Sequence, residues 1–443
     1  MIQKHNSYNL LFILTICFIL NTLKSMAASD DTVSIDDKRQ VESPGLPSIK
    51  IGKTNYKKIS SIEELVFNNI EVPNYGKPSK QLKFDLPTDA VSFTIVIYKN
   101  ENLFSYVHEL IDPSNIEIIK SNITAAKEAE YRNLLTPNFY MWNRPQMTPE
   151  SPNIIYPGVF SEFSVTPVPN SDTVKIKSGI WKFSISHQFS NDNNIPPDGS
   201  TLLKKANYKV SVFIKKSSES FTNKTIGYVP LKLYTTNNSG IILSEDNFKN
   251  INSELKSALQ SYFKNGIKLD IIKQKNAVLD TNVTYDESDF SSNQNVKNLI
   301  RLWSLPKSDN ERAINIYILK DIQNNEAGFS FYAGSVSSFF NESSEKFGGV
   351  LIRNNVGSTS FNLGRVLIHE VSHYLGLYHT SEDNITDSFS YQSHVYNLNN
   401  KNSTNKDPKN LMEEGENGGD FLSLGQKYVL LRNIFVSNYT PID

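Results

Sequence analysis

Three of the seven histidines in this 443-residue chain fall within one segment of eleven residues, HEVSHYLGLYH. His369 and His373 are four residues apart, His379 follows six residues later, and Glu370 comes directly after the first histidine. Residues four apart lie one above the other on an α-helix, so both imidazoles can bind one metal ion from a rigid element. The spacing therefore predicts zinc ligands at His369 and His373.

The glycine of this segment predicts how a third ligand is added. Gly376 lies where the helix would end, because glycine readily adopts the left-handed conformation that turns the chain. His379 can then reach back to the metal and leave a fourth position for water, as in catalytic zinc sites. Glu370 projects beside the imidazoles, where it can reach that water but not easily the metal, which suits a general base. Zinc lowers the pKa of such a water to about 7, so the set predicts peptide-bond hydrolysis.

A catalytic site has two alternatives. The first is chance: the extended pattern fixes five positions, three of them histidine, and should arise by chance on the order of once in 10⁵ chains of this composition. The second is a structural or degenerate zinc site. Structural zinc normally has four protein ligands, and no fourth histidine or cysteine lies nearby in the sequence.

HEVSHYLGLYH resembles the HExxHxxGxxH signature of the metzincin clan of zinc metallopeptidases, and Thr380 after the third histidine is similar to its pappalysin-like branch. Metzincins carry a methionine in a tight turn below the metal. KNLMEEG places Met412 thirty-three residues past His379, and Ser423 is the predicted N-cap of a final helix. The resemblance implies a metzincin fold for this part of the chain; a plain core methionine is the alternative for Met412.

The resemblance has further implications and two departures. It implies that residues 327–337 form an edge strand that pairs with an extended substrate, with an ordinary surface hairpin as the alternative. The only cysteine, Cys17, lies in the leader, so neither cysteines around the methionine turn nor latency through a pro-segment cysteine is expected. The first tyrosine after Met412 is Tyr428, expected on the last helix, which leaves zinc itself to stabilise the oxyanion.

Two acidic segments suggest calcium as a second metal, as pappalysin-like relatives do. Oxygen clusters on loops suit calcium, but both segments lack the glycine-punctuated spacing of a dedicated calcium loop, so solvated charge is favoured. The acidic residues are Asp286, Glu287 and Asp289 in YDESD and Glu382, Asp383 and Asp387 in TSEDNITDS.

The N-terminal residues predict export. Lys4 and His5 precede the apolar run LLFILTICFIL, and the small residues SMAAS follow, so we expect residues 1–28 to be a signal peptide. The run is shorter than the roughly 20 residues that span a bilayer as a helix, so the mature chain should have no transmembrane span. An uncleaved anchor is one alternative, and a lipoprotein is another. The lipoprotein is less favoured because Ile16 precedes Cys17 where a small residue is usual.

The pattern of the mature chain predicts a multidomain protein. Residues 29–80 are polar and interrupted by prolines, as in a linker or pro-segment. Alternating residues, among them Phe93 and Ile95 in DAVSFTIVIY, predict an N-terminal antiparallel β-sandwich over residues 81–222. Strand and helix then alternate, which predicts an α/β (α+β) metzincin-type zinc peptidase domain over residues 223–443.

Within the second domain, the expected elements are a strand at 228–235, a helix before Gly266, a helix in NVKNLIRLW, strands in IKLDIIK, AINIYIL and FGGVLIR, and a helix from about residue 361. An apolar stripe should pack this last helix against the sheet. The stripe consists of Leu363, Leu367, Val371 and Leu375.

Composition narrows the choice of partners. The 45 basic and 46 acidic residues nearly cancel, so nothing favours nucleic acid or an anionic membrane surface, and we expect protein or peptide substrates. The oligomeric state is not predicted. The leading hypothesis is a secreted zinc endopeptidase with Glu370 as base. The alternative is a surface adhesion or binding protein whose sandwich domain binds the partner and whose zinc site is vestigial.

Overall fold

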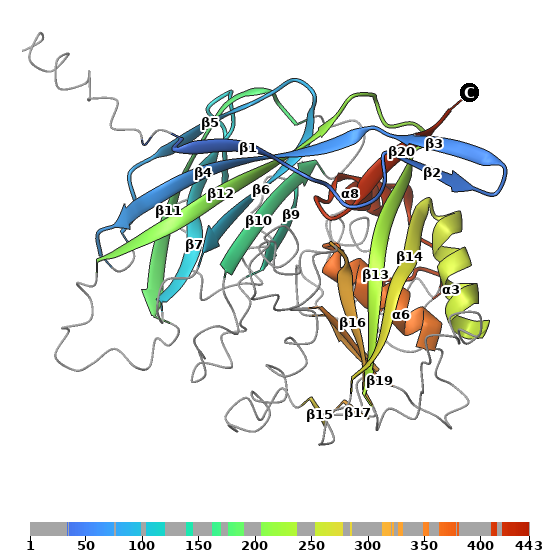
Figure 1. The fold of residues 1–443 in the computed structure, drawn as a ribbon. Helices are drawn as coiled ribbons and strands as arrows, with labels where there is room; N and C mark the ends of the chain where they lie inside the picture. Colours follow the sequence, from blue (N-terminus) through green and yellow to red (C-terminus); the bar gives the residue numbers. More distant parts are fainter. Residues whose placement is uncertain are drawn as a thin grey trace, which may run out of the picture.

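The described part of the chain is mostly β-sheet with three α-helices (Figure 1). The signal peptide, the acidic residues considered for calcium and the predicted helix at residues 295–303 lie outside it. The computed structural model describes residues 33, 35–74, 77–98, 103–119, 139–144, 162–169, 176–189, 205–236, 253–277, 284–285, 312–319, 321–322, 327–330, 349–353, 363–377, 379–380, 409–413 and 419–442.

Two antiparallel sheets share one hydrophobic core in the N-terminal half. The alternating residues predicted to share a face, including Phe93, Ile95 and Val212, lie in this core together with Trp181. The larger sheet has the order β1 (Asp37–Val41), β4 (Ser60–Val72), β12 (Ala206–Ser217), β6 (Ala90–Tyr98), β10 (Glu162–Pro169) and β9 (Phe139–Arg144). The smaller has the order β5 (Leu82–Leu86), β11 (Gly179–Phe189), β7 (Leu103–Ile111) and β8 (Glu117–Ile119).

A mixed eight-stranded sheet forms the centre of the C-terminal half. Its strands β13, β14, β16 and β19 run parallel, while β18 and β20 pair antiparallel with their neighbours. The order is β18 (Gly328–Ser330), β19 (Val350–Arg353), β16 (Ile314–Leu319), β13 (Ile226–Thr236), β20 (Ser437–Pro441), β3 (Thr54–Lys58) and β2 (Ser48–Ile51), with β14 (Ile267–Ala277) also on β13. A separate pair joins β15 (Thr284–Tyr285) and β17 (Asp321–Ile322).

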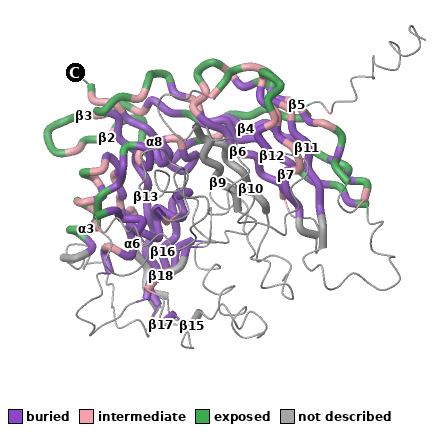
Figure 2. The backbone as a smooth tube through the Cα atoms, turned by 180° about the vertical axis from the view of Figure 1, so that it is seen from behind, coloured by how far each residue is buried: buried purple, intermediate pink, exposed green. Residues whose placement is uncertain are grey.

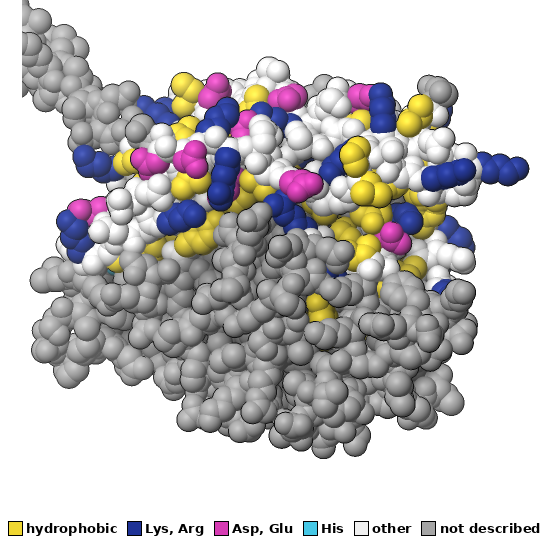
Figure 3. All heavy atoms as spheres, in the orientation of Figure 1, with side chains coloured by type: hydrophobic (Ala, Val, Ile, Leu, Met, Phe, Trp, Pro, Cys, Tyr) yellow, Lys and Arg dark blue, Asp and Glu magenta, His cyan; other side chains and the backbone are white. Residues whose placement is uncertain are grey.

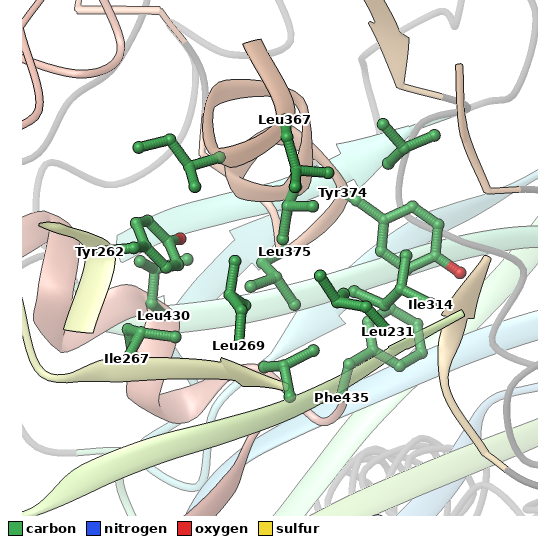
Figure 4. Close-up of a cluster of buried hydrophobic side chains, with 14 of the residues drawn as sticks. Leu231, Tyr262, Ile267, Leu269, Ile314, Leu367, Tyr374, Leu375, Leu430 and Phe435 are labelled. Atoms are coloured by element: carbon green, nitrogen blue, oxygen red, sulfur yellow. The ribbon is translucent and has the colours of Figure 1, made fainter. Parts of the chain in front are cut away.

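Helices α3 (Ser253–Lys264), α6 (Leu363–Tyr374) and α8 (Leu424–Arg432) pack onto this half of the molecule (Figure 1). The predicted stripe of α6 is buried, and Leu367 and Leu375 lie among side chains from β13, β14 and β16 (Figure 4). The Tyr262 hydroxyl on α3 lies 2.8 Å from Ser372 Oγ on α6, so a buried hydrogen bond joins the two helices. None of the helices described is both long and apolar enough for a membrane crossing.

The N-terminal residues differ from the predicted linker, since residues 37–72 contain four strands that join both halves. β1 and β4 belong to the six-stranded sheet, whereas the β2–β3 hairpin pairs with β20 of the C-terminal sheet. The pattern did not reveal them because β1 to β3 have no fully buried side chain and β4 buries two glutamates, Glu63 and Glu64. The division into domains stays a prediction.

The second face of the six-stranded sheet packs against the C-terminal half. Val96 and Phe213 point away from the N-terminal core and belong to the buried cluster that contains α6. Between the halves, the Lys215 Nζ donates hydrogen bonds to the carbonyls of Leu431 (2.6 Å), Asn433 (2.8 Å) and Val436 (2.6 Å). Complete burial lowers the pKa of Lys215 well below its usual value.

Burial and surface charge follow this arrangement. Buried backbone runs through the central strands of all three large sheets, and exposed backbone is concentrated in β2, β3 and the outer turns (Figure 2). On the face shown in Figure 3, basic and acidic side chains of the described residues are interspersed.

Candidate metal centre

Helix α6 holds two of the three histidines, and its C-terminal end directs the chain to the third. Gly376 has φ +97°, a left-handed conformation that ends the helix at low cost for glycine. The Gly376 N–H donates to the His373 carbonyl (2.8 Å), and the Leu377 N–H donates to the Ser372 carbonyl (2.9 Å). These two bonds form a Schellman cap, as the position of the glycine predicted. The chain then returns to place His379 beside the helix.

The structure brings the three histidines together at their Nε2 atoms. The Nε2 atom of His373 lies 3.1 Å from that of His369 and 3.1 Å from that of His379, and the remaining pair is 3.3 Å apart. Nitrogen atoms bound to one zinc ion at about 2.0–2.1 Å in tetrahedral geometry lie roughly 3.3–3.4 Å apart. The triad therefore fits zinc, and among the described residues it is the one cluster of three or more ligand side chains.

The other ring nitrogens explain why this cluster requires a cation. His369 Nδ1 lies 2.7 Å from the Leu411 carbonyl, and His373 Nδ1 lies 2.7 Å from the Leu377 carbonyl. A carbonyl only accepts, so each Nδ1 carries the proton and each Nε2 presents a lone pair. Two lone pairs 3.1 Å apart repel each other unless a cation lies between them. Burial, followed by the nearby His379, lowers the pKa of His369 to about 3, which favours the neutral, ligating form.

Glu370 lies next to the triad on the same helix, and its residue is buried with 9% exposure. Strand β18 passes close to it. A Cβ added at Gly328 would lie 2.6 Å from Glu370 Cγ and 2.8 Å from Val366 Cγ1, so only glycine fits here without displacing the glutamate. β18 is the terminal strand of the described sheet and pairs only with β19 among the described strands. The rest of the predicted edge segment, residues 331–337, lies outside the described residues.

Met412 lies in a tight turn that contacts the ligand segments. The Glu413 N–H donates to the Asn410 carbonyl across the turn, and the Met412 side chain is fully buried. The Thr380 N–H donates to the Met412 carbonyl (3.0 Å), and the Thr380 hydroxyl donates to Glu413 Oε2 (2.8 Å). The turn is thus bonded to the residue that follows His379, and through the Leu411 carbonyl to His369.

The sequence did not reveal the acceptors of the two Nδ1 protons, because they are backbone carbonyls that any residue type supplies. The N-cap predicted at Ser423 is confirmed, and Gln426 completes a capping box with it. Ser423 followed three residues later by glutamine was the available signal. Tyr428 lies on α8, as expected, and its ring centroid is 3.2 Å from the guanidinium carbon of Arg432.

Comparisons with known proteins agree with this geometry. Residues 299–433 match the family model of Peptidase M43, described as pregnancy-associated plasma protein-A. The chain is 35% identical over 80 residues to an extracellular metalloprotease of Sordaria macrospora, a match that covers 18% of this chain and 28% of that relative. The C-terminal region of this chain is therefore a pappalysin-like metzincin peptidase domain with a three-histidine metal site.

Structural comparisons give weaker similarities. Metalloproteinase-II from Bacteroides fragilis has a TM-score of 0.30 and 13% identity, covering 50% of this chain and 62% of that one. The CspB protease of Clostridium perfringens has a TM-score of 0.20 and 10% identity, covering 34% and 25%. The chain spans less than two thirds of each of these relatives. Such low TM-scores carry no argument about fold or activity.

Proposed function

We propose that this protein is an exported zinc-dependent endopeptidase that hydrolyses peptide bonds in proteins. The observation that carries the proposal is the convergence of three imidazole Nε2 atoms within 3.3 Å of one another, with the Glu370 carboxylate on the same helix. The match of residues 299–433 to a peptidase family supports it.

In this proposal His369, His373 and His379 hold the zinc ion. Bound zinc supplies a Lewis acid that polarises the scissile carbonyl and makes a water molecule acidic at neutral pH. Glu370 takes up the proton of the attacking water on its carboxylate and then delivers it to the departing amine. The Leu411 and Leu377 carbonyls hold the rings of His369 and His373 in the tautomer that keeps each Nε2 unprotonated.

The remaining predictions complete the proposal. Residues 1–28 act as a signal peptide, and the name of the relative, an extracellular metalloprotease, supports export over lipoprotein anchoring. The two N-terminal sheets form a β-sandwich domain, for which their shared core is the support. An extended substrate pairs with β18 at the edge of the C-terminal sheet. Calcium binding at the acidic segments stays a prediction.

The decisive experiment replaces Glu370 by the isosteric glutamine. Glu370→Gln should still bind one zinc ion, but its kcat for casein cleavage should fall by roughly 10²–10⁴-fold, the usual contribution of a general acid–base group. Glu71→Gln is the matched control, because Glu71 is exposed and pairs with Lys205 in the N-terminal sheet. Unchanged cleavage by Glu370→Gln, or activity that survives 1,10-phenanthroline, would contradict the mechanism. A wild-type protein that binds a surface partner but cleaves nothing would favour the adhesion alternative.

A further inference from the structure

The methionine turn is bonded to the N-terminal cap of α8 through two buried side chains. Asn410 Nδ2 donates to Gln426 Oε1 over 3.0 Å, and the same oxygen accepts the backbone N–H of Ser423 over 3.0 Å. The Gln426 N–H in turn donates to Ser423 Oγ, so the glutamine is held at both its backbone and its side chain. Asn410 is 2% exposed and Gln426 is fully buried, which shields these bonds from competition by water.

The other end of the Asn410 amide holds the turn itself. Asn410 Oδ1 accepts the backbone N–H of Met412 over 2.8 Å, an Asx-type bond that spans Leu411. The carbonyl of the spanned residue, Leu411, is the acceptor for His369 Nδ1 at 2.7 Å. Arg365, one helical turn before His369, also donates to this carbonyl at 3.4 Å. The direction of the Leu411 carbonyl therefore depends on the peptide conformation that Asn410 fixes.

We propose that Asn410 is a positioning residue for the metal centre: held by Gln426, its side chain sets the turn that presents the Leu411 carbonyl to His369. A hydrogen bond to the outer nitrogen of a ligating histidine fixes the tautomer and orientation of the ring and raises its basicity. The effect of Asn410 thus reaches the metal through Leu411 and His369, without contact with the metal or the substrate. The inference rests on the proposed function only in that the three histidines bind zinc.

The test measures zinc affinity by competition with a chromophoric chelator, together with the melting temperature of the metal-free protein. Asn410→Ala should weaken zinc binding by roughly 10–100-fold, the usual effect of removing an outer-shell partner. Asn410→Ser should fall between Asn410→Ala and the wild type, because its hydroxyl can still accept the Met412 N–H, though more weakly than an asparagine.

Asn438→Ala is the matched control. Asn438 is also a buried asparagine, and its Nδ2 donates to the Leu431 carbonyl on α8 at 3.0 Å, away from the ligand segments. This variant should lose melting temperature but keep its zinc affinity. If Asn410→Ala does not fold, Asn410→Ser and Asn438→Ser carry the same comparison.

Two results would overturn the inference: wild-type zinc affinity in the Asn410 variants, or an equal loss of affinity in the Asn438 control. Failure of the proposed function is separate and visible in the wild type. A wild-type chain that binds no zinc at the triad removes the metal site, and one that binds zinc without cleaving protein removes the peptidase activity.

Discussion

At the level of single residues, the two nitrogens of each helical histidine have different roles. Nδ1 of His369 and Nδ1 of His373 each donate to a backbone carbonyl at 2.7 Å, which leaves both Nε2 atoms free of protons at the centre of the triad. His379 is less buried and comes from the segment after the helix, so it is the ligand whose position depends most on the chain turn at Gly376.

Replacing His379 tests whether all three imidazoles are needed. His379→Ala should weaken zinc binding by more than the roughly 10–100-fold that is typical of outer-shell changes, because two ligands remain on the helix. Titration with zinc against a competing chelator measures the loss. His108→Ala, a histidine of the N-terminal sheet, serves as the control and should bind zinc normally. Equal affinities for the two variants would mean that the third ligand is another residue.

At the level of helices and strands, the site is formed where the terminal strand β18 passes helix α6. The helix carries Glu370 and two ligands, and Gly328 on the strand gives the glutamate its space, because a Cβ added there would lie only 2.6 Å from Glu370 Cγ. Strand and helix are held on opposite sides by β19 and by the buried stripe of α6, so neither can move away cheaply.

Gly328→Ala should therefore displace the Glu370 side chain while leaving the triad intact. A shift of about 1 Å in a catalytic group can lower the rate about 10²-fold, so kcat should fall by roughly 10–100-fold with zinc content unchanged. Steady-state cleavage of a fluorogenic peptide and metal analysis measure the two quantities. Gly52→Ala is the control, because nothing lies within 4 Å of a Cβ added there. Wild-type kcat in Gly328→Ala would show that Glu370 tolerates the extra methyl group.

At the level of the complete chain fold, the N-terminal residues are structural parts of both halves. The β2–β3 hairpin extends the C-terminal sheet through β20, and β1 and β4 complete the six-stranded sheet. Lys215 inserts from that sheet into three carbonyls around the end of α8, the helix whose N-terminal cap is bonded to Asn410. The two halves are thus coupled through buried polar contacts.

Lys215→Ala should lower the free energy of unfolding by about 3–5 kcal/mol, because three buried carbonyls lose their donor and each costs about 1–3 kcal/mol. Urea unfolding followed by fluorescence measures this change. Lys216→Ala is the neighbouring control and should cost about 1 kcal/mol, since Glu63 keeps its ion pair with Lys38. A loss for Lys215→Ala no larger than that of the control would mean that the joint contributes little stability.

Local patterns in the sequence were sufficient to identify the residues that could bind the metal and several of the elements. Helical spacing placed His369 and His373 on one face, and Gly376 and Ser423 marked the helix ends, because these signals depend on local backbone geometry. Period-two alternation identified strands such as β6 and β12 for the same reason.

Contacts between segments distant in the sequence became visible only in the folded chain. The Leu411 carbonyl, the space at Gly328 and the carbonyls around Lys215 are set by how the chain packs, and no local pattern encodes them. The strands within residues 37–72 escaped prediction because their stability comes from pairing with β12 and β20, 130 or more residues away in the sequence, and little from their own hydrophobic pattern.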